Sequence, residues 1–168
     1  MKKNIVLIGM PGCGKTAVGR ELSAMLHMML VDTDQMVEQA DGRTIPEIFA
    51  QEGEWAFRDR ESAAAKRAAS MSGVVVATGG GMVLREENMR ALGENGIIFF
   101  RDRALSDILG EDLTDRPLLR ADQQRIYDLY EQRIHLYRKY ADHTIYNTNT
   151  ANEAAERIAA IYERECER

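Results

Sequence analysis

The stretch Gly9-Met10-Pro11-Gly12-Cys13-Gly14-Lys15-Thr16 decides the fold of this 168-residue chain. It follows an apolar run at residues 5–8, which predicts a buried strand, and it opens onto a predicted helix at residues 15–27. A strand, the pattern G-x-x-x-x-G-K-[ST] and a helix together form a loop that holds phosphate groups. Glycines allow the backbone to approach a polyanion closely, and successive N–H groups then point at it. We therefore predict a nucleotide site, with Lys15 at the β- and γ-phosphates and the Thr16 hydroxyl on Mg²⁺.

Cys13 lies inside this loop, while the other cysteine, Cys166, lies near the C-terminus. Their positions argue against a disulfide framework. Two interpretations of Cys13 stay open: a small residue tolerated at a variable position of the motif, which we favour, or a thiol activated by the helix dipole. We expect the nucleotide to contact Gly12, Cys13, Gly14, Lys15, Thr16 and Ala17.

Size and composition describe an ordinary globular protein, with 45% hydrophobic and 29% charged residues. We find no internal repeat or linker, so we predict one domain over residues 1–168. As a separate expectation, the protein is a monomer. The net charge of −5 argues against sequence-independent nucleic-acid binding, which needs a basic face. No apolar run is long enough to span a membrane, and residues 1–3 lead directly into the first predicted strand. We therefore expect no membrane attachment and a cytoplasmic location.

Predicted strands and helices alternate along the chain, which indicates an α/β fold with a parallel sheet covered on both faces. Strands are expected at residues 5–8, 29–31, 74–77, 97–100 and 144–146. Helices are expected at residues 15–27, 35–40, 45–51, 54–70, 86–94, 123–140 and from 152 onward. The polar stretch at residues 110–122 predicts a mobile lid. Ligands of such sheets bind beyond the carboxyl ends of the strands, where the polar segments of this chain would meet.

Two aspartates, Asp32 and Asp34, follow the second predicted strand. Asp32 is placed to hold Mg²⁺, directly or through water, beside Thr16. Asp34 is placed to accept a proton from a hydroxyl group and to orient that group for attack. Taken alone, these residues support equally well an N-cap or turn carboxylate. The phosphate loop favours the functional interpretation.

Gly79-Gly80-Gly81 follows the third predicted strand. Three glycines cost chain entropy, so they indicate either close approach of the backbone to a small polyol or a flexible turn.

Arg58 and Glu61 stand three residues apart on one predicted helix and share a face. They are either a surface ion pair or an arginine held by Glu61 to grip a substrate carboxylate. The aromatic residues Phe49, Trp55 and Phe57 are expected mainly in the core.

Taken together, these marks resemble the shikimate kinase family. In chain order they are the phosphate loop ending in Gly14-Lys15-Thr16, Asp32-Thr33-Asp34, Phe57-Arg58 with Glu61, Gly79-Gly80-Gly81 followed by Val83, Arg85 and Asn88, Arg116-Pro117-Leu118-Leu119, and Arg133 with Leu136-Tyr137 and Ala141. The resemblance implies a three-layer P-loop kinase fold with strand order 2-3-1-4-5 and a lid. It also implies ATP-dependent phosphorylation of the 3-hydroxyl of shikimate, which yields shikimate 3-phosphate and ADP in aromatic amino acid biosynthesis.

The resemblance assigns roles to single residues. Asp34 looks like the group that binds the hydroxyl and acts as base, and Arg58 and Arg133 look like a carboxylate clamp in which Glu61 holds Arg58. The glycines Gly79, Gly80 and Gly81 look like further shikimate contacts, and the helices at residues 33–61 look like the substrate-binding segment. Arg116 looks like a lid arginine that reaches the ATP phosphates and, with Lys15, stabilises the transferring phosphoryl group.

Two stretches depart from the family pattern, because each lacks an arginine often found near the adenine. They read Leu109-Gly110-Glu111-Asp112 and Asn147-Thr148-Asn149-Thr150. We therefore expect weaker contacts between the protein and the adenine base of the nucleotide. Two alternative functions are a kinase for another small polyol acid such as gluconate, and a nucleotide-binding regulator without catalysis. The run Gly79-Gly80-Gly81 with the clamp pair Arg58 and Arg133 argues against the first. Asp34 and Arg116 argue against the second.

Overall fold

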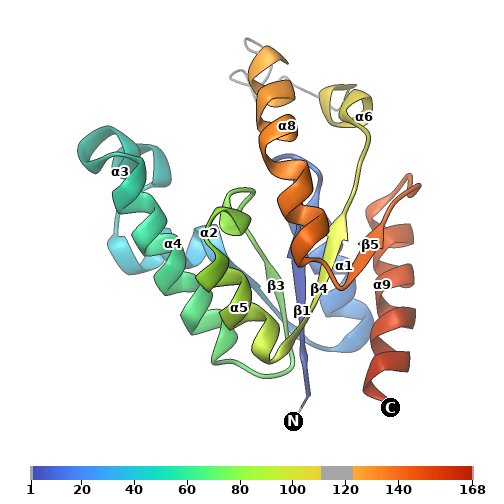
Figure 1. Ribbon diagram of the computed structural model, residues 1–168. Helices are drawn as coiled ribbons and strands as arrows, with labels where there is room; N and C mark the ends of the chain where they lie inside the picture. Colours follow the sequence, from blue (N-terminus) through green and yellow to red (C-terminus); the bar gives the residue numbers. More distant parts are fainter. Residues whose placement is uncertain (1, 111–122, 168) are drawn as a thin grey trace.

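The computed structural model describes residues 2–110 and 123–167. Its centre is one sheet of five parallel strands in the order β2-β3-β1-β4-β5 (Figure 1). The strands are β1 (Asn4–Ile8), β2 (Met29–Asp32), β3 (Val74–Ala77), β4 (Gly96–Arg101) and β5 (His143–Ile145). The predicted fold class and strand order are therefore confirmed.

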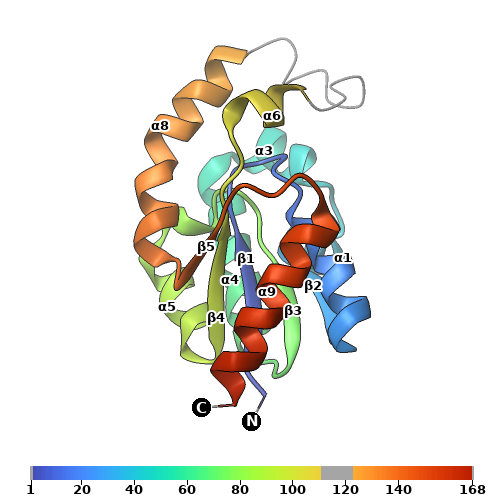
Figure 2. The same cartoon turned by 90° about the vertical axis from the view of Figure 1, so that its right-hand side faces the viewer.

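Helices cover both faces of this sheet. They are α1 (Lys15–Leu26), α2 (Thr33–Asp41), α3 (Ile45–Glu52), α4 (Glu54–Ala69), the short 3₁₀ helix η1 (Met82–Leu84), α5 (Glu86–Glu94), α6 (Leu105–Gly110), α8 (Gln123–Tyr140) and α9 (Ala151–Cys166). Figure 2 shows the sheet edge-on, with α1 and α9 on one side and α5 and α8 on the other. Among the described residues, no helix is both long and apolar enough to cross a membrane.

The central strand β1 shows why the sheet must be covered on both faces. All five of its residues are buried. Val6 and Ile8 pack into the cluster under α4, α5 and α8, whereas Ile5 and Leu7 pack into the cluster under α1 and α9. Side chains alternate between the two faces of a strand, so a register slip of one residue would exchange the two sets. Each fully buried aliphatic side chain contributes about 1.5–3 kcal/mol relative to exposure.

The segment that carries Asp34, Arg58 and Glu61 is shaped by local signals. Helix α2 ends at Gly42, whose φ of 86° suits a glycine C-cap. Helix α3 begins with a capping box, in which Thr44 and Glu47 bond to each other's backbone N–H groups. Gly53, with φ 85°, then separates α3 from α4. These turns place α2, α3 and α4 side by side at one end of the sheet (Figure 1).

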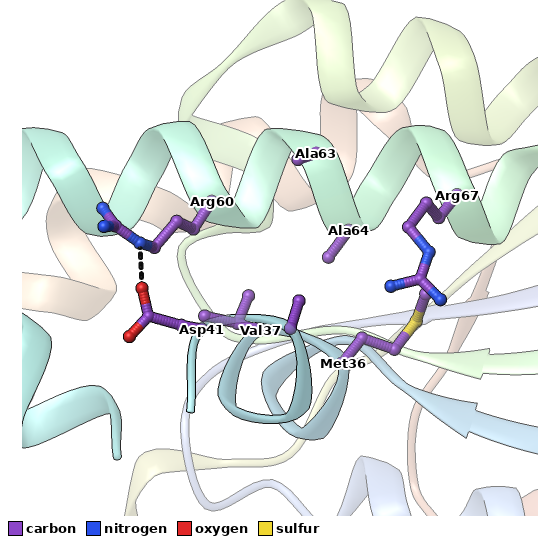
Figure 3. A pocket seen from close by; sticks show the side chains of 8 residues that line it. Met36, Val37, Asp41, Arg60, Ala63, Ala64 and Arg67 are labelled. Atoms are coloured by element: carbon purple, nitrogen blue, oxygen red, sulfur yellow. Dashed lines mark hydrogen bonds and ion pairs between the residues drawn. The ribbon is translucent and has the colours of Figure 1, made fainter. Parts of the chain in front are cut away.

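A narrow groove of about 140 Å³ runs between α2 and α4 (Figure 3). Apolar side chains such as Met36, Val37 and Ala64 form most of its wall. At one end Arg60 donates from Nε to Asp41 across 2.5 Å, and Arg43 bonds to the same carboxylate across 2.6 Å. Mainly through the Arg43 hydrogen bonds, this pairing lowers the pKa of Asp41 to about 2. The ion pair joins α2 to α4 away from Asp34, and no predicted site residue within residues 2–110 and 123–167 lines the groove.

Several element boundaries differ from those predicted. Helix α2 begins at Thr33 rather than residue 35, because Asp32 caps it, and η1 and α6 were not predicted. Of the three aromatic residues expected in the core, only Phe57 is buried, whereas Phe49 is 39% and Trp55 80% exposed. Trp55 does not lie on the buried face of α4. Instead, the Arg85 guanidinium lies over its ring, 5.5 Å from the ring centroid. Apart from Gly110, which closes α6, the predicted lid lies outside the described residues.

Candidate functional site

The loop between β1 and α1 turns through three glycines with positive φ. The angles are 152° at Gly9, 78° at Gly12 and 88° at Gly14, a region that side chains strongly disfavour. A Cβ at Gly9 would also lie only 2.9 Å from the carbonyl oxygen of Arg101. Helix α1 starts at Lys15 with no side-chain cap, so its first N–H groups face the loop and suit an anion.

Lys15 is folded into this loop. Its Nζ donates to the carbonyl oxygens of Gly9 across 2.7 Å and Met10 across 2.9 Å, and the residue is 8% exposed. The thiol of Cys13 is fully buried in the cluster beneath the loop. That position favours the interpretation of Cys13 as a small packed residue.

Asp32 caps α2, as one of its two interpretations predicted, and it also contacts the phosphate loop. Its Oδ1 accepts from the backbone N–H groups of Asp34 (2.9 Å) and Gln35 (3.2 Å), so it caps α2. Its Oδ2 accepts from Thr16 Oγ1 across 3.1 Å, which joins the phosphate loop to the end of β2.

A hydroxyl beside a carboxylate fits Mg²⁺, which takes oxygen ligands and keeps several waters. In residues 2–110 and 123–167 no group of three or more His, Cys, Asp or Glu side chains could hold a metal ion.

Asp34 lies in the same cleft as the phosphate loop. The cleft has a volume of about 460 Å³. Its lining is Pro11, Gly12, Gly14, Lys15, Thr16, Ala17, Arg20, Asp32, Asp34, Thr78, Gly79 and Gly80. Burial, together with the negative charges of Asp32 and Glu61, raises the pKa of Asp34 to about 6, while Lys15 acts in the opposite direction. The carboxyl group therefore titrates near neutral pH, as a general base does.

Each of the three glycines approaches a different part of the site. A Cβ at Gly79 would lie 2.7 Å from Asp34 Oδ1 and 3.1 Å from Glu61 Oε2. A Cβ at Gly80 would lie 2.7 Å from the Pro11 ring of the phosphate loop. At Gly81 a Cβ would lie 2.6 Å from the guanidinium carbon of Arg58. The three glycines thus lie close to Asp34, the phosphate loop and Arg58, and none has the positive φ of the loop glycines.

The ion pair between Arg58 and Glu61 is buried on its Glu61 side, while the Arg58 side chain is 12% exposed. Arg58 donates from Nη1 to Oε1 of Glu61 across 2.8 Å, and the Glu61 side chain is 1% exposed. Burial raises the pKa of Glu61, whereas Arg58, Arg133 and Arg85 act to lower it. Arg58 also lines a second cleft of about 260 Å³ with Trp55 and Arg85. This arrangement excludes the interpretation of the pair as a surface ion pair.

Arg133 reaches the same region from α8. It is 8% exposed and is one of the cations that act on Glu61. Its Nε is buried without a hydrogen-bond partner in the described part of the chain. Buried polar atoms are usually paired, so this nitrogen is an unsatisfied donor among the described residues.

On the far side of the phosphate loop, a cleft of about 590 Å³ lies between the segment after β4 and the loop after β5. Asn147, Thr148 and Asn149, which belong to a stretch that departs from the family pattern, line it. Arg103 and Tyr146 line it too, and the sequence interpretation missed both. Arg116 lies outside the described residues, and its role stays a prediction.

Comparisons with known proteins agree with this geometry. The family model described as shikimate kinase matches residues 11–163. The chain belongs to the shikimate kinase family. A shikimate kinase of Clostridium beijerinckii is 43% identical over 163 residues, covering 94% of this chain and 96% of that protein. One of Thermodesulfovibrio yellowstonii is 44% identical over 168 residues, covering 96% of each.

Solved structures of the family share the fold. A shikimate kinase from Acinetobacter baumannii in complex with shikimate superposes with a TM-score of 0.87 at 34% identity, covering 99% of this chain and 94% of that one. The structure from Aquifex aeolicus gives a TM-score of 0.84 at 32% identity, covering 97% and 98%.

Proposed function

We propose that this chain transfers the γ-phosphoryl group of ATP to the 3-hydroxyl of shikimate. The observation that carries the proposal is the shared cleft, in which Asp34 and two of the three glycines line the same wall as the phosphate loop. A phosphoryl donor and a hydroxylated acceptor can therefore meet within one cavity. The family assignment and the shikimate complex of the Acinetobacter relative support the choice of acceptor.

The acceptor end suits a small hydroxylated acid. Arg58 and Arg133 bring two guanidinium groups toward the buried Glu61, and Arg133 Nε has no protein partner in the described structure. An acceptor carboxylate would bind between these cations, because guanidinium groups pair with carboxylates in two-point geometry. The glycine backbone would lie against the ring of the acceptor.

In the reaction, the 3-hydroxyl oxygen of shikimate attacks the γ-phosphorus, and the bond from that phosphorus to the bridging oxygen of ADP breaks. Asp34 accepts the hydroxyl proton, which a carboxylate with a pKa of about 6 can do at neutral pH. Lys15 exchanges its loop carbonyls for phosphate oxygens and stabilises the charge that they carry. Thr16 and Asp32 would hold Mg²⁺, which neutralises charge on the β- and γ-phosphates when bound.

The deciding experiment measures turnover with ATP and Mg²⁺ and identifies the product. We expect shikimate 3-phosphate from shikimate and little product from gluconate. Equal rates on both acids would contradict the assigned acceptor. An Asp34→Ala variant should bind ATP but lose phosphoryl transfer, whereas normal turnover by this variant would remove Asp34 as the base.

We further propose that the protein acts as a monomer, because Asp34, Arg58, Arg133 and the phosphate loop all come from one chain. Sedimentation at assay concentration tests this, and a stable dimer would contradict it.

A further inference from the structure

Tyr137 reaches the glycine segment from α8. Its Oη donates to the carbonyl oxygen of Gly80 across 2.6 Å. The side chain is fully buried and stacks on Phe100 of β4, with ring centroids 5.2 Å apart. The hydroxyl is therefore held at this carbonyl by packing against the sheet.

Gly80 occupies the middle of the site. It packs against Pro11 of the phosphate loop, while Gly79 on one side approaches Asp34 and Gly81 on the other approaches Arg58. A displacement of Gly80 would therefore shift the backbone next to Asp34, the proposed base, and next to Arg58 of the carboxylate clamp.

The glycine segment is fastened from two different elements. The Gly79 N–H donates to Thr33 Oγ1 of α2 across 3.1 Å, and the Gly80 carbonyl accepts from Tyr137 of α8. Glycine has the largest conformational freedom to lose, so a run of three needs external bonds to hold one geometry. Thr33 and Tyr137 supply them.

Tyr137 also shares a face of α8 with Arg133, four residues earlier. Burial raises the pKa of Tyr137 to about 12, while the Arg133 guanidinium acts in the opposite direction. The phenol therefore keeps its proton at neutral pH and remains a donor to the carbonyl. One helix thus provides both a clamp cation and the bond that holds the glycine segment.

We infer that Tyr137 is a positioning residue for the acceptor: by holding the Gly80 carbonyl, it fixes the glycine segment between Asp34 and Arg58. The inference rests on the proposed function, since the acceptor is the shikimate assigned above. Tyr137 is assigned its effect on the acceptor through the backbone of the glycines, by way of the Gly80 carbonyl.

The test is Tyr137→Phe, which removes the hydroxyl and keeps the ring on Phe100. We expect KM and Kd for shikimate to rise roughly three- to tenfold, the effect of losing one hydrogen bond to a buried carbonyl. KM for ATP should stay within about twofold, because the nucleotide is held mainly by the loop N–H groups and Lys15. Shikimate binding can be read from the fluorescence of Trp55, the single tryptophan, which lines a cleft with Arg58.

Tyr127→Phe is the matched control, because Tyr127 lies on the same helix and is 45% exposed. It should leave both constants unchanged. A purely structural role of Tyr137 would lower the melting temperature and the active fraction but not change KM, which is independent of enzyme concentration. Wild-type KM and Kd for shikimate in Tyr137→Phe would therefore overturn the inference. If the wild-type protein itself neither binds nor phosphorylates shikimate, the proposed function fails instead.

Discussion

The guanidinium of Arg58 is held by the carboxylate of Glu61 across 2.8 Å, at a position where Glu61 is 1% exposed. Arg58 has a second carboxylate neighbour, Glu54, at 3.3 Å, but that side chain is 61% exposed. Exposed pairs contribute little, whereas removal of one partner of a buried pair leaves the other charge poorly compensated. The orientation of Arg58 therefore depends mainly on Glu61.

We predict that Glu61→Gln raises KM for shikimate about tenfold, because the neutral amide no longer fixes the Arg58 guanidinium. KM for ATP should change less than about twofold. The control is Glu54→Gln, for which we expect less than a twofold change, roughly the effect of an exposed pair. Steady-state kinetics on both variants checks this, and equal effects of the two substitutions would show that burial of Glu61 is irrelevant.

Asp34→Asn should stabilise the unliganded protein at neutral pH while abolishing phosphoryl transfer. The pKa of Asp34 is raised from 3.8 to about 6, mainly by burial, so between these values the folded state retains a proton that the unfolded state has lost. Folding stability therefore decreases as pH rises through this window, and the ionised carboxylate destabilises the fold above it. At 1.36 kcal/mol per pKa unit the gain at pH 7 is on the order of 1–3 kcal/mol.

Thermal unfolding from pH 3.5 to 8, without nucleotide or Mg²⁺, tests this prediction. The melting temperatures of variant and wild type should converge at the acid end and differ by several degrees at the neutral end. The control is Glu94→Gln at the exposed end of α5, which does not act on Asp34 and should follow the wild-type profile. A constant difference across the whole range would show that the gain does not come from titration of Asp34.

Two substitutions at Asp32 separate its role as the N-cap of α2 from its proposed role as a Mg²⁺ ligand. Asparagine caps helices as well as aspartate does, so Asp32→Asn should retain the bonds to the start of α2 and the melting temperature. Loss of the carboxylate should raise the Mg²⁺ concentration for half-maximal activity roughly tenfold or more. Asp32→Ala should show the same Mg²⁺ effect and lose about 1 kcal/mol of stability as well. Unchanged Mg²⁺ dependence in both variants would remove Asp32 from the metal site.

Gly81→Ala should damage the acceptor site through Arg58. The new Cβ would lie 2.6 Å from the guanidinium carbon, so the side chain that grips the carboxylate has to move. Misplacement on the scale of 1 Å costs up to about a hundredfold in rate, and we expect kcat/KM for shikimate to fall at least tenfold. Gly93→Ala is the control, because its Cβ would meet only Ile98 at 3.6 Å and alanine suits a helix. Wild-type kinetics in Gly81→Ala would mean that the Arg58 side chain can move away from the new Cβ and still bind the carboxylate of shikimate.

Much of the fold was predictable because its signals are local. The apolar runs of β1 and β3 and the motif ending in Lys15 and Thr16 are continuous in sequence, and each forms one element. The strand order, by contrast, came from the family resemblance and not from periodicity, since it depends on pairings between distant segments.

The structure brings predicted residues such as Lys15, Asp34 and Gly79 into one cleft, but their geometry was not predictable from the sequence. That Gly79, Gly80 and Gly81 each approach a different group depends on the packing of α2, α4 and the phosphate loop around them. The raised pKa of Asp34 likewise depends on burial and on charges brought together by folding. Trp55 was misplaced because an aromatic residue suggests a core, whereas α4 turns other residues inward. Arg103 and Tyr146 belong to no sequence motif. Their position beside the predicted adenine site therefore became visible only in the three-dimensional structure.

The inward position of Lys15 has a consequence for inhibitor design. In the unliganded protein its ammonium group is already satisfied by the carbonyl oxygens of Gly9 and Met10. A neutral, apolar compound placed over the phosphate loop gains no attraction from this cation, and displacing it would leave a buried charge without acceptors. A compound that offers an anionic group at the loop replaces those acceptors with stronger ones. Useful inhibitors of this cleft should therefore either carry a phosphate mimic or leave the loop alone and occupy the region of Arg58, Arg133 and the three glycines.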